Sequence, residues 1–220
     1  DKIIKAQRIA EKGFAHMLDF IRVGRTEKEI QLELDYYMLK NGAEALSFDT
    51  IALSGSNTSL PHGVPSDKKV ESGEFVLMDF GATYDGWHSD MTRTVCVGKP
   101  SDKMKSVYET VLTAQLSALD AVKAGMPGKA LDKIARDIIT EAGYGDNFGH
   151  SLGHGVGVEI HESPYASPSR EDILPENSIV TVEPGIYLEG KFGVRIEDFV
   201  VVTENGCINM TKAPKELVCL

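Results

Sequence analysis

The stretch Glu74–Gly98, EFVLMDFGATYDGWHSDMTRTVCVG, decides how the rest of this chain is interpreted. It contains the apolar run Phe75–Met78 near its start and a second strand-like run, Met91–Val95, near its end. The dipeptide Asp85-Gly86 lies between the two runs, and both of its residues tolerate the positive φ of a tight turn. The stretch therefore predicts two antiparallel strands joined by a two-residue turn.

Each of these predicted strands contains an aspartate. A two-residue turn pairs Asp79 with Thr92 and Asp90 with Gly81, so the aspartates become diagonal neighbours on one face, roughly 7–8 Å apart at Cα. Aspartate is disfavoured in strands, and two on one face repel each other unless a positive group lies between them. A solvent-facing hairpin would also tolerate them, but apolar residues surround both positions. This environment favours a shared positive ligand.

Composition limits the classes of protein to which the chain can belong. Its 220 residues can bury a sizeable core, and a net charge of −10 argues against a nucleic-acid or anionic-membrane partner. The three cysteines, Cys96, Cys207 and Cys219, form no CxxC pair, which favours a reducing compartment. There is no leader-like segment and no run of membrane-spanning length, so we expect a soluble, cytoplasmic protein. Because Asp1 already lies inside a helical pattern, we also expect a fragment that lacks an upstream domain.

Apolar periodicity predicts four helices in two pairs. The expected ranges are 3–21, 26–40, 101–125 and 128–142. Glycines at 24 and 125 and at 42 and 143 recur at a spacing of 101 residues, which indicates an internal duplication. Strand-like segments cover 47–54, 74–97 and much of the sequence after 143. The order α-α-β-α-α-β predicts one α+β domain over residues 1–220, with helices packed on a mainly antiparallel sheet.

Three of the six histidines fall in one glycine-rich window. His150, His154 and His161 are interspersed with glycines at 149, 153, 155 and 157. A single histidine in an apolar segment is usually a core residue, but glycines that allow close approach of the backbone favour a site here. The window therefore supplies candidate ligands.

Two glutamates follow apolar strand-like segments further along the chain. Glu183 comes directly after residues 179–182, and Glu197 lies in the segment Val194–Asp198. A buried carboxylate is costly unless it is paired or metal-bound. An ion pair with Arg195 on the same strand face would also satisfy Glu197.

One hypothesis explains all of these acidic positions. Asp79, Asp90, Glu183, Glu197 and a histidine make an oxygen-rich set suited to two divalent ions such as manganese, cobalt or zinc. The two ions would balance four negative charges, share a water, lower its pKa and deliver hydroxide to a carbonyl. The remaining histidines and Arg195 would then bind a carboxylate or stabilise an oxyanion.

Two rival motifs have weaker support. Residues 149–153, GHSLG, match the G-x-S-x-G elbow of serine hydrolases around Ser151, but that elbow requires a strand before it and a helix after it. The context here is a helix end and a glycine-rich loop. His161-Glu162 begins like a zincin helix, but Tyr165 stands where the second histidine is needed.

The motifs that carry these residues resemble the pita-bread metallopeptidases, the group of methionine aminopeptidase, aminopeptidase P and prolidase. The matching segments are MDFGATYDGWHSD at 78–90, LGHGVG at 152–157, TVEPG at 181–185 and VRIED at 194–198. Two further segments, SLPHGVP at 59–65 and EIHESP at 159–164, also match. The resemblance covers essentially the whole chain and implies the pita-bread fold, with pseudo-two-fold helix pairs packed on a curved, mainly antiparallel sheet.

The resemblance also implies a ligand set. Asp90 and Glu197 would bridge two divalent ions, and manganese is the expected metal. Asp79 would hold one ion, and His154 and Glu183 the other. Glu183 would also carry the proton of the bridging water.

Four further residues have implied roles in catalysis and substrate binding. His62 and His161 match the histidines that contact substrate and intermediate. His150 and Arg195 resemble the proline-specific branch of the family, in which they would bind the proline side or the terminal carboxylate of the substrate.

We therefore expect a metallopeptidase that hydrolyses Xaa-Pro bonds, either in dipeptides or at the start of longer peptides, through a metal-bridging hydroxide. The alternatives are a methionine aminopeptidase and a non-catalytic interaction module of the same fold. The expected partner is a peptide with proline in second position, and a homodimer through a missing N-terminal domain is also implied.

Overall fold

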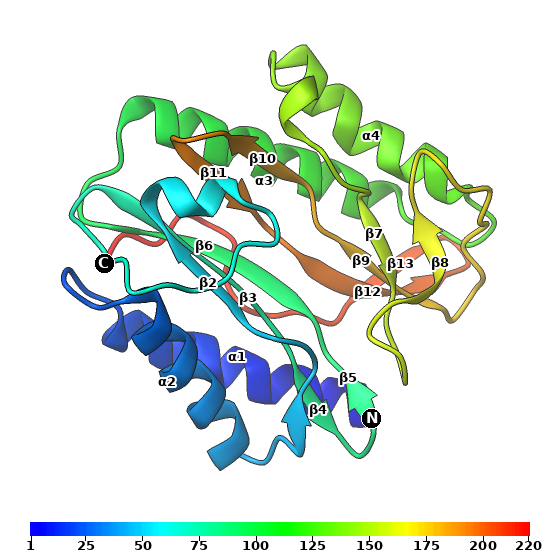
Figure 1. Ribbon diagram of the computed structural model, residues 1–220. Helices are drawn as coiled ribbons and strands as arrows, with labels where there is room; N and C mark the ends of the chain where they lie inside the picture. The colour runs from blue at the N-terminus through cyan, green and yellow to red at the C-terminus, as the bar shows by residue number, and fades with distance from the viewer.

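The computed structural model describes residues 1–220 and contains two pairs of helices with the strands between them (Figure 1). The first pair is α1, Lys2–Phe20, and α2, Glu27–Lys40; the second is α3, Asp102–Ala121, and α4, Gly128–Glu141. The bounds of α4 are those of α2 moved along the chain by 101 residues, which agrees with the predicted repeat. None of these helices combines the length and the apolar character that a membrane span needs.

Local sequence signals account for the beginning and end of α2. The Thr26 hydroxyl accepts a hydrogen bond from the Glu29 N–H at 3.1 Å, and the Glu29 carboxylate accepts one from the Thr26 N–H at 2.8 Å. This capping box satisfies two backbone donors that the helix leaves free. Gly42 follows the helix with φ of 105°, a conformation that favours glycine.

One predicted helix end is wrong. The helix expected to continue to residue 125 ends at Ala121. The backbone N–H of Ala124 instead bonds the Thr203 carbonyl, and that of Gly125 bonds the Leu174 carbonyl. Contacts with distant segments therefore draw the chain out of the helix before the glycine.

The strands form four antiparallel groups. Their orders are β1-β4-β5, β2-β3-β6, β10-β11 and β13-β12-β9-β7-β8. The bounds are β1 Ala45–Leu46, β2 Ile51–Ser54, β3 Glu74–Phe80, β4 Ala82–Tyr84, β5 Trp87–His88, β6 Met91–Val97, β7 Gly153–Gly155, β8 Glu162–Ala166, β9 Ile179–Val182, β10 Gly185–Leu188, β11 Phe192–Arg195, β12 Asp198–Thr203 and β13 Gly206–Asn209. Two short 3-10 helices, η1 Gly55–Ser59 and η2 Gly145–Asn147, complete the structure. The α+β class predicted from the sequence is confirmed.

The hairpin register is confirmed, but the hairpin is not two continuous strands. Asp79 pairs with Thr92 as predicted, and Asp85 and Gly86 have φ of 49° and 73°. The strands break near Gly81, where an added Cβ would lie 1.9 Å from the Ser89 carbonyl oxygen. The outer parts, β4 and β5, then join β1 in a separate sheet. The predicted strand 47–54 is likewise shorter, because only 51–54 belong to β2.

Each helix pair covers its own part of the apolar core. One cluster of 18 buried side chains combines residues of α1 and α2 with residues of β3 and β6. A second cluster of 24 combines α3 and α4 with β9, β11 and β12. In the view of Figure 1, α1 and α2 lie below the strands and α3 and α4 lie above them.

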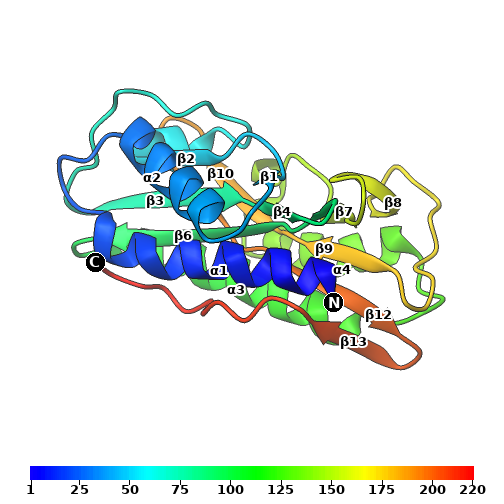
Figure 2. The same cartoon turned by 90° about the horizontal axis from the view of Figure 1, so that it is seen from below.

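Residues 210–220 run along the junction between the two halves, beside α1 (Figure 2). The buried Arg93 of β6 donates to the carbonyls of Ala213 and Pro214 in this segment, each at 2.8 Å. It also donates to the Glu197 carbonyl at 2.6 Å and pairs with the Asp198 carboxylate at 2.8 Å. One guanidinium thus joins β6, the start of β12 and the C-terminal segment.

Replacing Arg93 with methionine should lower the free energy of unfolding by about 3 kcal/mol or more, because the carbonyls of Glu197, Ala213 and Pro214 lose their buried donor. The Asp198 carboxylate would keep only Lys215 as a charged partner. The matched control is Lys133→Ala, which breaks an exposed pair with Asp137 and should cost less than about 1 kcal/mol. Urea denaturation of both variants measures the difference. Equal midpoints for the two variants would contradict this role for Arg93.

Candidate metal centre

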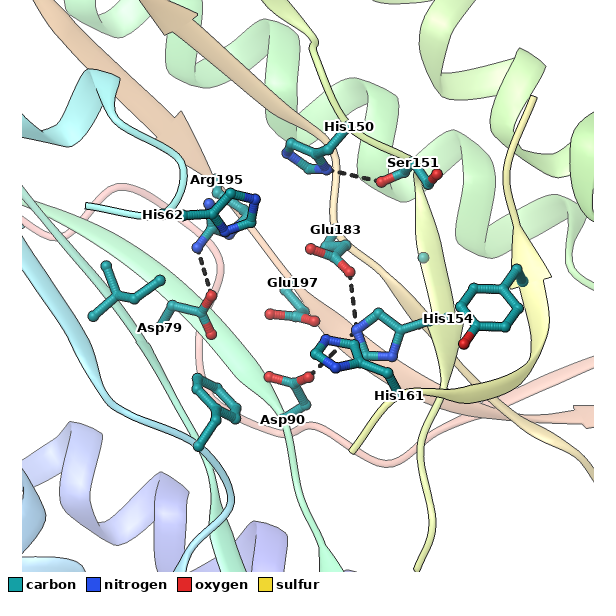
Figure 3. A pocket seen from close by; sticks show the side chains of 14 residues that line it. His62, Asp79, Asp90, His150, Ser151, His154, His161, Glu183, Arg195 and Glu197 are labelled. Atoms are coloured by element: carbon teal, nitrogen blue, oxygen red, sulfur yellow. Dashed lines mark hydrogen bonds and ion pairs between the residues drawn. The ribbon is translucent and has the colours of Figure 1, made fainter. Parts of the chain in front are cut away.

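A cavity of about 390 Å³ opens where the strand ends of the two halves meet. All nine residues that the sequence singled out line it, and Figure 3 shows their side chains directed toward a common space. They are His62, Asp79, Asp90, His150, His154, His161, Glu183, Arg195 and Glu197.

The four carboxylates come from equivalent places in the two halves. Asp79 lies in β3, and Asp90 directly precedes β6, its pairing partner. Glu183 directly follows β9, and Glu197 directly precedes β12. Because β9 and β12 pair in the register Val182↔Asp198, the two glutamates lie one step further along the same ladder. Each half therefore contributes one pair of carboxylates from two adjacent strands.

His154 completes the acidic cluster. One ligand atom from each of Asp90, His154 and Glu197 lies within 4.8 Å of the others. The Nε2 atom of His154 is 3.6 Å from an Asp90 oxygen and 3.3 Å from a Glu183 oxygen. Its Nδ1 atom donates to the Gly155 carbonyl at 3.0 Å, which fixes the ring so that Nε2 faces the carboxylates.

Burial and crowding shift the titration of these groups. Burial, and then the charge of Asp79, raise the pKa of Asp90 well above its ordinary value. Burial, and then the charge of Asp90, do the same to the pKa of Glu197. Burial alone would raise the pKa of Glu183 and lower that of His154, but their contact reverses both shifts, to about 2 for Glu183 and about 9 for His154. The cluster therefore favours positive charge in its midst.

The donor set fits divalent metal ions. Four carboxylates and an imidazole provide the hard ligands that manganese, cobalt or zinc accept. The Oδ1 atom of Asp79 is buried and has no hydrogen-bond partner among the protein atoms, although buried polar atoms are usually satisfied. A cation among the carboxylates would satisfy that atom and relieve the repulsion that raises the neighbouring pKa values.

Arg195 is held by protein groups on several sides. Its Nη2 atom pairs with Asp79 at 2.5 Å, and its Nη1 atom donates to the Tyr187 hydroxyl at 2.7 Å. Its Nε atom donates to the Thr92 hydroxyl at 3.1 Å, and that hydroxyl donates to Glu197 at 2.7 Å. The direct ion pair between Arg195 and Glu197 that the sequence allowed is therefore not formed, and the Thr92 hydroxyl connects the two side chains instead.

Tyr187, which the sequence left open between packing and hydrogen bonding, connects Arg195 to His150. The Nδ1 atom of His150 faces the Ser151 carbonyl at 2.8 Å, and a carbonyl can only accept. The Nε2 atom of the neutral ring therefore accepts from the Tyr187 hydroxyl, also at 2.8 Å. Burial is the main cause that lowers the pKa of His150, so the neutral ring is favoured.

Helix α4 fixes the loop that carries His150, and no sequence motif indicated this. Arg136 donates to the carbonyls of Phe148 and His150 at 2.9 and 2.8 Å. Asp132, its ion-pair partner on the same helix, accepts from the Leu152 N–H at 3.0 Å. Charged residues on a helix are ordinary in sequence, so only the tertiary structure reveals this anchoring.

The remaining candidates divide between the cavity and its surroundings. Ser151 lines the cavity, but its hydroxyl donates to Ser167 at 2.9 Å, and strand β7 rather than a helix follows it. His88 lies outside the cavity lining and contacts Thr83 at 3.2 Å, as expected for a local hydrogen-bonding residue. Sequence reasoning missed three lining residues with large apolar or aromatic side chains: Phe48, Ile51 and Tyr165.

Comparison with known proteins gives consistent matches. The model of metallopeptidase family M24 matches residues 1–204. The chain is 51% identical over 216 residues to the uncharacterized peptidase YqhT of Bacillus subtilis and 50% identical over 216 residues to an Xaa-Pro dipeptidase of Pyrococcus furiosus, with 98% of the chain covered in each case. It spans only 61% and 62% of the length of these two relatives.

Solved structures agree with these matches. An Xaa-Pro dipeptidase from Bacillus anthracis superposes with a TM-score of 0.97 at 51% identity, covering 99% of this chain and 61% of that one. An X-Pro aminopeptidase from Thermotoga maritima superposes with a TM-score of 0.97 at 52% identity, covering 100% of this chain and 62% of that one.

Replacing Asp90 with asparagine should weaken binding of divalent manganese more than tenfold, because it removes a negative charge from the group Asp90, His154 and Glu197 that could hold the ion. The matched control is His88→Ala, two residues away and outside the cavity lining, which should bind as the unaltered protein does. Isothermal titration with Mn²⁺ measures both affinities without reference to catalysis. Unchanged affinity in the Asp90 variant would place the ions elsewhere.

Proposed function

This chain belongs to metallopeptidase family M24, and on that premise we propose that it hydrolyses the peptide bond between a first residue and proline. The observation that carries the proposal is the convergence of Asp79, Asp90, His154, Glu183 and Glu197 on one cavity with four other polar residues of the predicted site. The names of two relatives, both Xaa-Pro dipeptidases at about half identity, support the substrate class.

We propose that the four carboxylates and His154 hold two divalent ions and that the metal is manganese. Such ions, when bound, supply a water of lowered pKa and an electrophile for the substrate carbonyl. Because carboxylates and imidazole accept several metals, cellular supply decides between manganese, cobalt and zinc.

Proton movement in this proposal belongs to Glu183. Its carboxylate lines the cavity and lies 3.3 Å from the Nε2 atom of His154, so it is placed to accept a proton from a nucleophile bound there. The Thr181 hydroxyl donates to its Oε1 atom at 3.1 Å and restrains its orientation. The same carboxylate would pass the proton to the leaving nitrogen of proline.

Two histidines at the cavity wall would bind the reacting carbonyl. His161 packs edge-on against His154, with ring centroids 4.4 Å apart, and burial is the main cause that lowers its pKa. It is therefore neutral near pH 7 and keeps one N–H to donate. His62 lies on the same cavity, and together the two side chains would support the oxyanion that forms during attack.

The proline side of the substrate needs handles other than an amide hydrogen, because the Xaa-Pro nitrogen carries none. Phe48, Ile51 and Tyr165 offer apolar surface for the ring, and Arg195 offers a guanidinium to a neighbouring carbonyl or terminal carboxylate. His150 would join it by exchanging its bond to the Tyr187 hydroxyl for one to the substrate. This combination favours a proline substrate over one with an ordinary second residue.

Assays on Ala-Pro, Ala-Pro-Ala and Met-Ala under defined Mn²⁺ test the proposal. We expect cleavage of the two proline substrates in preference to Met-Ala, loss of activity with a chelator and recovery with Mn²⁺. The ratio of the two proline substrates separates dipeptidase from aminopeptidase action. Preference for Met-Ala would indicate a methionine aminopeptidase, whereas chelator-resistant activity with covalent labelling of Ser151 would indicate a serine hydrolase.

Replacing Glu183 with glutamine should lower kcat on Ala-Pro by roughly 10²–10⁴-fold at saturating Mn²⁺, because the proton acceptor is removed. Glu189→Gln is the matched control, since Glu189 is an exposed carboxylate six residues along the same chain segment and outside the cavity lining. A loss smaller than tenfold for Glu183→Gln would exclude Glu183 as the proton carrier.

A further inference from the structure

Glu27 is a buried carboxylate outside the cavity lining that forms no ion pair with a basic side chain. It is the first residue of α2 and has no exposed surface. Its partners are hydrogen-bond donors from Ser54, Asn57 and Ser66. Burying a charge is costly, so a fully buried acid is usually paired with a basic side chain. Glu27 instead has only neutral donors, all from one segment distant in sequence.

The two oxygens of Glu27 hold opposite ends of that segment. Oε1 accepts from the Ser54 N–H at 2.7 Å and the Ser54 hydroxyl at 3.2 Å. Oε2 accepts from the Ser66 N–H at 2.9 Å and the Ser66 hydroxyl at 2.6 Å. The Asn57 amide lies between them, at 3.0 Å from Oε1 and 3.2 Å from Oε2. One carboxylate therefore closes the loop 54–66 at its base.

This loop carries His62 to the cavity. It leaves the sheet at the end of β2, passes through η1 and returns to Ser66. Near its tip the Pro61 carbonyl accepts from Arg195 at 3.4 Å, and the Thr58 hydroxyl accepts from the Gly193 N–H at 2.8 Å. The loop is thus held at its base by Glu27 and near its tip by residues of β11.

A carboxylate can serve both ends of the loop, whereas an amide of the same shape cannot. Both oxygens of a carboxylate accept, whereas an amide presents one acceptor and one donor group. In a glutamine at this position, the NH₂ group would face either the Ser54 or the Ser66 N–H, and that end of the loop would lose its acceptor. Hydrogen bonds to a charged acceptor are also stronger than those to a neutral one.

We propose that Glu27 is a positioning residue that fixes the base of the loop 54–66 and thereby the place of His62 in the cavity. The proposal rests on the proposed function in giving His62 a role at the reacting carbonyl. The hydrogen bonds between Glu27 and the loop involve no substrate or metal ion, so the order of the loop can be measured without an activity assay.

Hydrogen exchange of the metal-free protein tests the positioning directly. Glu27→Gln should accelerate exchange of the backbone amides in the loop 55–65 roughly tenfold or more. Exchange of the amides in the β-strands should be unchanged. Glu29→Gln is the matched control: it removes the same charge from the same helical turn, but Glu29 bonds only with its own helix start and Arg25. Unchanged exchange in 55–65, or an equal change in the control, overturns the proposal.

A double-mutant cycle with His62 separates positioning from general destabilisation. Glu27→Gln should lower kcat/KM on Ala-Pro roughly tenfold when His62 is present and less than about twofold in the His62→Ala background. If Glu27→Gln does not fold, Ser66→Ala takes its place in the cycle. This variant keeps Glu27 and removes one donor, so it should lower kcat/KM in the same way but by a smaller factor. An equal loss in both backgrounds overturns the proposal, whereas an unaltered protein that does not cleave Ala-Pro overturns the proposed function and leaves the exchange result valid.

Discussion

The repulsion among four carboxylates that share one cavity, two of them buried and two half-buried, is the constraint to which the rest of this structure responds. Burial strengthens that repulsion, because a low-dielectric interior screens charge poorly. The protein answers it in part: Arg195 pairs with Asp79, and His154 lies against Asp90 and Glu183. Burial first, and then the neighbouring carboxylates, keep the pKa values of Asp90 and Glu197 well above their ordinary values despite these two side chains. Divalent cations held among the carboxylates, as proposed, would complete the compensation, so the same charges that destabilise the fold would define its chemistry.

Much of this site could be predicted because its residues violate local rules. An acid such as Asp79 inside an apolar strand stands out, and a tight turn fixes its partner across the ladder. Apolar periodicity similarly predicted a helix at 128–142, where α4 spans Gly128–Glu141. Glu27 and Arg136 gave no such signal, because charged residues are ordinary on helices and their partners lie far away in sequence. The break at Gly81 also escaped prediction, since it follows from close approach to Ser89.

The two halves solve the same positioning problem with different residues. In each half, the second helix of the pair holds a loop that brings a histidine to the cavity. Helix α2 does so through Glu27 and the loop of His62, and α4 through Arg136 and the loop of His150. The cavity is therefore lined by loops and strand ends but supported by helices packed on the core. Such support suits a site whose groups must keep their places while substrate binds.

Because both halves of the repeat belong to one chain, the assembly of the site does not depend on protein concentration. If the two carboxylate pairs belonged to separate polypeptides, the site would come apart as the protein concentration fell below their dissociation constant. Here the halves are joined between β6 and α3 by the short segment Gly98–Ser101. A short covalent connection holds its partners at an effective concentration on the order of millimolar. The assembly of this centre is therefore a property of each single molecule and is independent of how many others surround it.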